Sequence, residues 1–310
     1  MLNSMLKLKR LAVICLPLFI LFSASSALAA HYEPGVEGVM AATTPPPGIH
    51  WRMYNAWMDA DTLNNDDGDE ANLEFDIKVF ANVNRLVWGS KTRLLGADWG
   101  MDVVIPLINA DLSIKVPSGP SLVDESSFGL GDITVEPLWM TWRLSRFDIS
   151  GGLALVIPTG SWDAQEALNT GEGYWSGMLT LGATWYMDEA KAWTASVLTR
   201  TLVHSEQEDT DITPGAGFVA EWGVGKSFMA GKNLQIRPGV AGFGQWQLTE
   251  DSGGSANKDA QVRKYGIGPE VNFFWLPPCL FQANLRVLQE FGAQSTSEGY
   301  QVVLTLTKSF

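Results

Sequence analysis

The sequence predicts an all-β protein: a closed antiparallel transmembrane β-barrel of about 12 strands, within a range of about 10–14, preceded by an N-terminal segment that forms no strand. Three observations predict this fold. The N-terminus has the parts of an export signal, and the rest of the chain alternates apolar and polar residues with a period of two. The connections between the alternating segments switch regularly between long acidic loops and short turns.

The first 29 residues are typical of a secretory signal peptide. Lys7, Lys9 and Arg10 give a basic start, residues 11–22 form an apolar run, and small residues follow up to Ala29. A membrane-spanning helix needs about 20 apolar residues, so this run is too short to remain as an anchor. We therefore expect a Sec-type signal peptide, residues 1–29, cleaved near Ala29.

Charge and cysteine content exclude several functions. The full chain carries a formal charge of −13, and removal of the basic signal makes the mature protein more acidic still. Nucleic-acid binding requires a basic face and is therefore not expected. Cys15 lies in the signal, which leaves only Cys279, so no internal disulfide and no cysteine-based metal site can form. We expect neither a metal nor a cofactor.

Segments of alternating polarity define the predicted strands of a barrel domain, residues 50–310. The clearest example alternates apolar Leu73, Phe75, Ile77 and Val79 with polar Glu74, Asp76 and Lys78. On this basis strands are predicted near residues 50–59, 73–88, 97–115, 130–142, 147–157, 175–187, 192–203, 215–228, 233–249, 260–276, 280–292 and 299–310. Proline cannot donate to a strand ladder, so bulges or strand edges are expected at Pro106, Pro137, Pro238 and Pro269.

The polar positions of these strands are candidates for the barrel interior. The predicted lumen-lining residues are Glu74, Asp76, Lys78, Asp132, Glu136, Arg200, Glu221, Arg237, Lys264, Glu270, Arg286 and Glu290. One interpretation is a set of paired charges that hold a wet interior together, because buried charge is tolerated only when it is paired or solvated. The other is that some of these residues line a permeation path and set its selectivity.

The connections and the aromatic residues place the barrel in a membrane. Loops after the odd-numbered strands are mostly long and acidic, as at residues 61–70, 206–211 and 250–254, whereas the other links are short. Long outer loops, short periplasmic turns and an even strand count are typical of outer-membrane barrels. Many of the thirteen tryptophans fall in or beside strands, where interfacial girdles are expected. The expected surroundings are outer-membrane lipid and lipopolysaccharide.

The last predicted strand carries an assembly signal. Its alternating residues Tyr300, Val302, Leu304, Leu306 and the final Phe310 resemble the C-terminal recognition strand of bacterial outer-membrane barrels, although Lys308 departs from that pattern. We therefore expect insertion by the barrel assembly machinery into the outer membrane of a Gram-negative bacterium.

The segment 30–49 is rich in proline and glycine and poor in charge. Its plug candidates are His31, Tyr32, Pro34 and Gly35. One hypothesis is that it folds back into the lumen as a plug, because a disordered tether is rarely this apolar. The alternative is a flexible periplasmic leader.

An ordered set of short motifs resembles one family over nearly the whole mature chain. The set comprises His31-Tyr32 with Pro34-Gly35 and Gly38, Pro45-Pro46-Pro47-Gly48, Gly129-Leu130-Gly131-Asp132, Pro137-Leu138-Trp139, Pro158-Thr159-Gly160, Gly173-Tyr174-Trp175, Asp251-Ser252-Gly253, Gly268-Pro269-Glu270 and Glu290-Phe291. Together these motifs resemble the outer-membrane proteins associated with the meta-pathway of phenol degradation. The resemblance implies a channel or transporter through which small hydrophobic or aromatic compounds diffuse passively.

Two other classes of outer-membrane barrel compete with a transport function. The chain could be a structural barrel, or a lipid-modifying one that lacks a transport role. An enzyme would need a nucleophile and a histidine within hydrogen-bond reach. The chain has three histidines, His31, His50 and His204, and no Gly-x-Ser-x-Gly elbow. We therefore expect no catalytic residues.

Overall fold

The computed structural model describes residues 31–254 and 256–310; the predicted signal peptide, residues 1–29, and its cleavage site lie outside them. The strands are β1 (Gly48–Leu63), β2 (Glu74–Leu94), β3 (Ala97–Lys115), β4 (Ser121–Leu130), β5 (Ile133–Arg143), β6 (Phe147–Ile157), β7 (Ser176–Tyr186), β8 (Trp193–His204), β9 (Gly217–Lys226), β10 (Phe228–Met229), β11 (Leu234–Gln247), β12 (Arg263–Trp275), β13 (Phe281–Gln294) and β14 (Ser297–Ser309). Within these ranges, no helix is long and apolar enough to cross a membrane.

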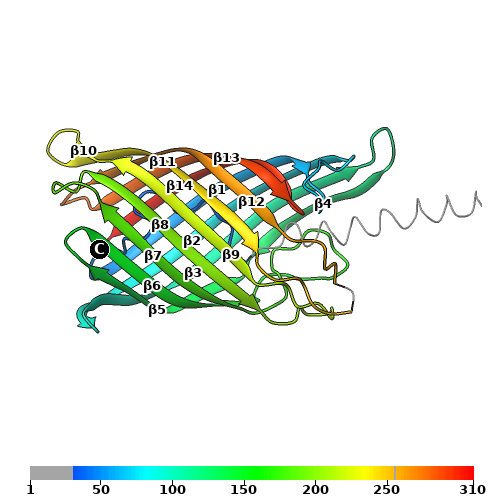
Figure 1. Cartoon of the computed structure of the whole chain (residues 1–310), viewed down its shortest axis with the longest axis horizontal. Helices are drawn as coiled ribbons and strands as arrows, with labels where there is room; N and C mark the ends of the chain where they lie inside the picture. The colour runs from blue at the N-terminus through cyan, green and yellow to red at the C-terminus, as the bar shows by residue number, and fades with distance from the viewer. Residues whose placement is uncertain (1–30, 255) are drawn as a thin grey trace, which may run out of the picture.

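The strands close into one antiparallel barrel. Strand β1 pairs with both β14 and β2, and β9 pairs with β11, so the sheet returns on itself. Twelve strands form the wall, because β4 pairs only with β3 and the two-residue β10 pairs only with β11. Figure 1 shows the tilted strands around the barrel, with the long connections at one end and the short ones at the other. The predicted closed barrel of about 12 strands is confirmed.

We call the two ends of the barrel the loop end and the turn end. The connections between β1 and β2, β6 and β7, β8 and β9, and β11 and β12 lie at the loop end and are long. At the turn end, β2 and β3 are joined by only Leu95 and Gly96, and the C-terminal residue Phe310 lies there too (Figure 1). The predicted alternation of long and short links is thus present.

Strand β4 was not predicted, and Pro106 explains its position. The loop-end half of β3 pairs with β4 from Leu107 onward, while the turn-end half pairs with β5 up to Val104. Pro106 lies between these two ladders, where its missing N–H is not required, and its carbonyl accepts the Gly131 N–H at 2.9 Å. Residues 121–129, expected to be part of a loop, are therefore in a strand that extends the wall beyond β5.

The predicted bulge at Pro137 is confirmed. The β5–β6 register shifts between Val135 and Leu138, so Glu136 and Pro137 are both left out of the ladder. A bulge changes which face the following side chains occupy. As a result Trp139, expected on the outer girdle, points inward and is only 4% exposed.

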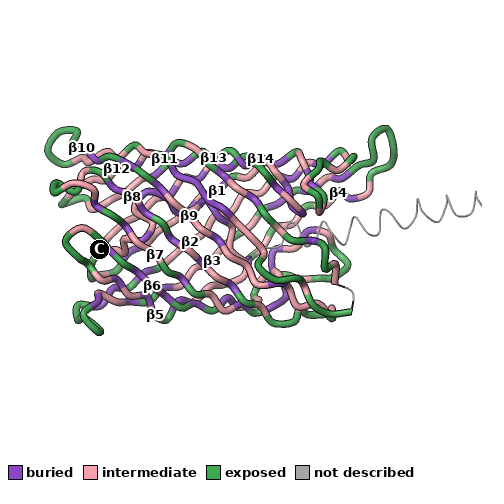
Figure 2. The backbone as a smooth tube through the Cα atoms, in the orientation of Figure 1, coloured by how far each residue is buried: buried purple, intermediate pink, exposed green. Residues whose placement is uncertain are grey.

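The outer surface carries an apolar belt. Exposed residues such as Leu153, Leu181 and Val240 occupy mid-strand positions, while aromatic residues including Trp175 and Trp185 lie nearer the strand ends. Figure 2 shows exposed backbone in the connections at both ends and alternating burial along the strands. A closed sheet with an apolar outer band is the arrangement that can span a bilayer with strands, because no backbone edge is left open.

Candidate functional site: the barrel lumen

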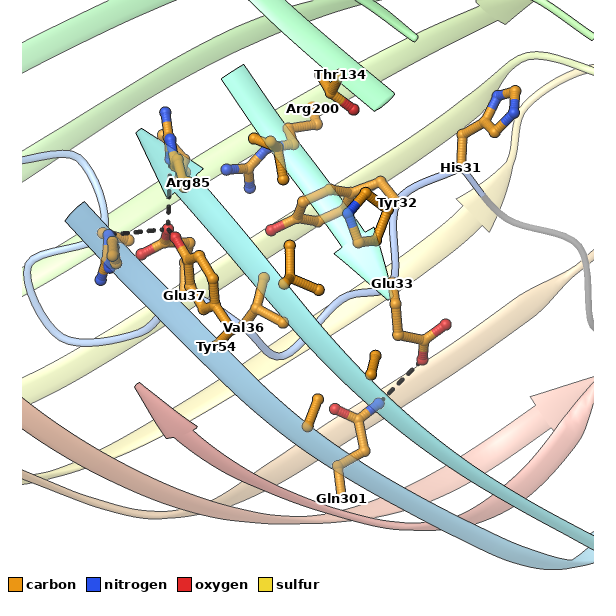
Figure 3. A pocket seen from close by; sticks show the side chains of 18 of the residues that line it. His31, Tyr32, Glu33, Val36, Glu37, Tyr54, Arg85, Thr134, Arg200 and Gln301 are labelled. Carbon is orange, nitrogen blue, oxygen red and sulfur yellow. Dashed lines mark hydrogen bonds and ion pairs between the residues drawn. The ribbon is translucent and has the colours of Figure 1, made fainter. Parts of the chain in front are cut away.

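Residues 31–47 form no strand and run through the lumen. We call this segment the leader. His31 contacts Ser176 and His204 at the loop end, and the leader reaches the turn end where β1 begins at Gly48. Figure 3 shows the leader crossing the interior, with its side chains pointing toward the surrounding strands. The leader belongs to the site because it lies in the lumen and contacts the surrounding strands.

Glu221 on β9 holds the middle of the leader. Its carboxylate accepts the backbone N–H groups of Gly35 at 2.9 Å and Glu37 at 2.8 Å, and also the Tyr32 hydroxyl. Arg200 on β8 pairs with the same carboxylate at 2.6 Å and lies over the Tyr32 ring, 4.0 Å from its centroid. Glu221 is fully buried, and these charge-assisted hydrogen bonds take the place of the water contacts that its carboxylate loses on burial.

Glu270 and Arg286 hold the next part. Glu270 accepts the Val39 N–H at 2.9 Å and pairs with Arg286 at 3.3 Å, and Arg286 in turn donates to the carbonyls of Gly35 and Val36. A guanidinium and a carboxylate on neighbouring strands thus bind opposite polar groups of the leader backbone. Without regular secondary structure of its own, the leader depends on such partners to satisfy its N–H and C=O groups.

The leader also supplies a charge to the opposite wall. Glu37 accepts from Arg52 at 3.2 Å and from the Tyr54 hydroxyl at 3.0 Å, both on β1, and lies 3.9 Å from an Arg85 nitrogen on β2. Figure 3 marks the contacts of Glu37 and also the bond between Glu33 and Gln301. Glu37 therefore connects the leader to β1 and β2, whereas Glu221 and Glu270 connect it to β9 and β12.

The loop-end tip of the leader is fixed by a relay of side chains. His31 Nε2 lies 2.9 Å from an Asp132 oxygen, its Nδ1 contacts the Ser176 hydroxyl, and that hydroxyl lies 2.6 Å from His204 Nδ1. A carboxylate, a histidine and a serine that contact one another in a row resemble the nucleophile set of a hydrolase. Ser176 is fully buried, however, and its hydroxyl is held between two imidazoles, so it serves as a bridge within the protein.

The turn end of the leader is fixed separately. The Thr43 hydroxyl donates to Asp148 at 3.0 Å, and Arg143 donates to the Thr44 carbonyl at 2.8 Å. His50, on β1, lies 2.8 Å from the Pro46 carbonyl and 2.8 Å from the Ser309 hydroxyl. Both ends of the leader are thus bound to the wall.

The remaining lumen is apolar along one side. Inward positions of β1 to β3 carry mostly small or aliphatic side chains, and these line a cavity of about 790 Å³ together with leader residues. Examples are Ala56, Met58, Ile77, Val79, Ala81, Val83, Val104, Pro106, Ile108 and Ala110. The cavity reaches Leu168 at the loop end and Phe310 at the turn end. Its size falls within the roughly 300–1,000 Å³ of small-molecule sites.

Nine of the twelve predicted lumen residues face inward: Asp132, Glu136, Arg200, Glu221, Arg237, Lys264, Glu270, Arg286 and Glu290. The assignment of Glu74, Asp76 and Lys78 to the lumen is wrong. Their neighbours Phe75 and Ile77 are buried at 5% and 6% exposure, whereas the Asp76 side chain is 49% exposed and pairs with Lys78 on the outer face. This part of β2 belongs to the loop end, where the outer face is polar.

The predicted plug candidates His31, Tyr32, Pro34 and Gly35 all lie in the lumen, and Pro34 and Gly35 are buried there. The sequence did not single out Glu33, Glu37, Arg52, Arg85, Asp102 or Gln301, which form much of the polar network. The other inward residues of β2 and β3 are apolar. A lone charged residue within an aliphatic run was therefore the signal that could have identified Arg85 and Asp102. Elsewhere in the described ranges, no group of three acidic, histidine or cysteine side chains is arranged to hold a metal ion.

The fold and the lumen define a transmembrane barrel with an internal leader, and comparison with known proteins gives its family. Residues 60–306 match the family described as "Putative MetA-pathway of phenol degradation", and the chain belongs to this family. No curated protein matches the chain.

Among solved structures, an outer membrane channel from Pseudomonas putida F1 has a TM-score of 0.72 at 15% identity, covering 91% of this chain and 100% of its own. The β domain of the Bordetella autotransporter BrkA has a TM-score of 0.54 at 10% identity, covering 86% of this chain and 100% of its own. The transport unit of the Escherichia coli autotransporter AIDA-I has a TM-score of 0.51 at 11% identity, covering 94% and 97%. At these identities the likenesses show a shared fold.

Proposed function

We propose that the protein is an outer-membrane channel through which small hydrophobic or aromatic compounds diffuse passively, with the leader as a plug that narrows the lumen. The observation that carries this proposal is the apolar inner wall of β1 to β3 beside the leader. A channel for ions or sugars would be lined by polar groups on all sides. Membership of a family named after phenol degradation supports the same class of solute.

The proposal includes a location and partners. A Sec-type signal removed near Ala29 would deliver the chain to the periplasm, and the assembly machinery would recognise β14 through Tyr300, Val302, Leu304, Leu306 and Phe310. Tyr300, Val302, Leu304 and Leu306 alternate along β14 with the inward Gln301 and Val303, so their side chains face lipid. The acidic loops would then meet lipopolysaccharide at the cell surface.

The experiment is uptake of toluene by intact cells with and without the protein, where the lipopolysaccharide leaflet is the barrier to apolar solutes, together with planar-bilayer conductance before and after addition of phenol. Val83→Thr keeps the shape of an inward residue but adds a hydroxyl, and we expect uptake to slow on the order of threefold because the solute passes a polar group. Val103→Thr is the matched control, since it makes the same change on the outer face of β3. Equal uptake by cells with and without the protein would favour a structural or lipid-modifying role instead.

A further inference from the structure

Several buried polar atoms in the lumen make no hydrogen bond, and among the described residues that line the cavity they belong to Arg52, Arg85, Asp102, Trp139 and Thr307. A donor and an acceptor from this set lie at neighbouring positions of the wall. Within the described part of the chain, the indole Nε1 of Trp139 and Oδ1 of Asp102 are buried and make no hydrogen bond. Both residues line the cavity, and they are 4% and 5% exposed. An unsatisfied buried donor or acceptor costs roughly 1–3 kcal/mol, so a pair of them at one cavity wall calls for an external partner.

The wall brings this donor and acceptor to adjacent positions. Trp139 pairs with Gly100 and Glu136 pairs with Asp102 across β5 and β3. The indole of Trp139 lies over Gly100, where a side chain would overlap the ring, so glycine makes room for it. Gly100 and Asp102 are two residues apart on the inward face of the same strand, so the indole and the Asp102 carboxylate occupy neighbouring inward positions.

The surrounding charges select against an anion. Asp102 and Glu136 both accept from Arg85, at 2.6 and 2.9 Å, and Glu37 pairs with Arg52. Three carboxylates thus share two guanidinium groups, so these five groups carry a formal charge of −1, although Nε of Arg52 and Nε of Arg85 are also donors without a partner. A bare ammonium group could donate to Asp102 but could not accept from Trp139. A neutral hydroxyl can do both with a single oxygen.

The path to these atoms is apolar. Val83, Val104 and Pro106 lie on the loop-end side of Arg85 and Asp102, on the inward faces of β2 and β3. We propose, building on the channel function above, that Trp139 and Asp102 bind the hydroxyl group of a small, uncharged, otherwise apolar solute. Trp139 donates to the hydroxyl oxygen, and the hydroxyl donates to Asp102 Oδ1, while the apolar body of the solute rests against the aliphatic wall.

The test is a magnetic-resonance titration of the whole protein in lipid nanodiscs with labelled indole N–H groups and a labelled Ile108 methyl. Ile108 lines the apolar wall and reports entry of any solute. The probes are cyclohexanol and methylcyclohexane, which match in size and differ by the hydroxyl. We expect cyclohexanol to shift the Trp139 indole signal and to bind about tenfold more tightly than methylcyclohexane, as one net hydrogen bond allows. Trp139→Phe assigns the signal and should remove the difference, whereas Trp99→Phe, on the outer face, should preserve it.

Two results would overturn the proposal, and they have different meanings. If both solutes shift Ile108 with equal affinity and cyclohexanol leaves the Trp139 indole unmoved, the hydroxyl subsite is wrong while the channel stands. If neither solute shifts Ile108, solutes do not enter the lumen, and the channel function fails together with the subsite.

Discussion

The carboxylate of Glu221 accepts the backbone N–H of Gly35 at 2.9 Å, although 186 residues separate them in the chain. This contact, repeated at Glu37 and supported by Arg200, ties the leader to β8 and β9 on one side of the lumen. The leader therefore occupies the polar half of the barrel and leaves the aliphatic half lined but unfilled. The first prediction tests whether this contact holds the leader in place.

Glu221→Gln should loosen the leader. Arg200 would be left buried without its counter-charge, and the Gly35 and Glu37 N–H groups would lose a charged acceptor, which together cost roughly 3–5 kcal/mol. We expect larger and more frequent openings in planar bilayers, and faster amide exchange in residues 31–39. Glu125→Gln is the control, because Glu125 also accepts two backbone N–H groups, those of Ala167 and Leu168 at 3.0 Å, and neither belongs to the leader. Identical conductance in wild type and Glu221→Gln would contradict a gating role for the leader.

The strand positions could be predicted because alternation, turn residues and proline act locally. The third strand, 97–115, and the fifth, 147–157, match β3 and β6 residue for residue. Which face is inward could not be predicted in the same way. A period of two gives two equivalent faces, and the rule that polar means inward fails for β2, where the lumen is apolar and the outer face beyond the belt is polar.

The site was less predictable because its contacts are long-range. Glu37 meets Arg52, Tyr54 and Arg85 only after the barrel has closed and the leader has entered it. Trp139 changes face because of a bulge, and proline indicated where the bulge lies without indicating how far the phase would shift. A local pattern carries no information about either event.

The two ends of the leader should respond to different histidine substitutions. His31→Ala removes the bonds to Asp132 and Ser176, so residues 31–35 should lose amide protection by about 1–3 kcal/mol in local opening free energy. His50→Ala removes the bonds to Pro46 and Ser309 and should loosen residues 43–47 instead. Hydrogen exchange with peptide resolution distinguishes the two patterns. Uniform loosening of the whole leader by either substitution would show that it is released as one unit.

We predict that the stability of the loop between β6 and β7 depends on pH through Glu172. Burial, and then the nearby charge of Asp132, raise the pKa of Glu172 to about 8. Because the folded-state pKa lies above the unfolded value, the native loop binds more protons, and its stability is full at low pH and falls as pH rises toward about 8. Protection factors for residues 158–175, corrected for intrinsic exchange, should therefore be lower at about pH 9 than at about pH 6. Glu172→Gln should remove most of this dependence, and a dependence that persists in the variant would assign it to another group.

The orientation of the barrel can be tested with single cysteines. Asp76 lies on the outer face at the loop end, its neighbour Ile77 faces the lumen, and the native Cys279 is exposed at the turn end. In a Cys279→Ser background, Asp76→Cys should react with a membrane-impermeant maleimide on intact cells, whereas Ile77→Cys should react far more slowly because it is buried. Wild-type Cys279 should react only after the outer membrane is made permeable, which provides an internal control from the natural sequence. Labelling of Cys279 on intact cells together with protection of Asp76→Cys would mean that the loop end faces the periplasm.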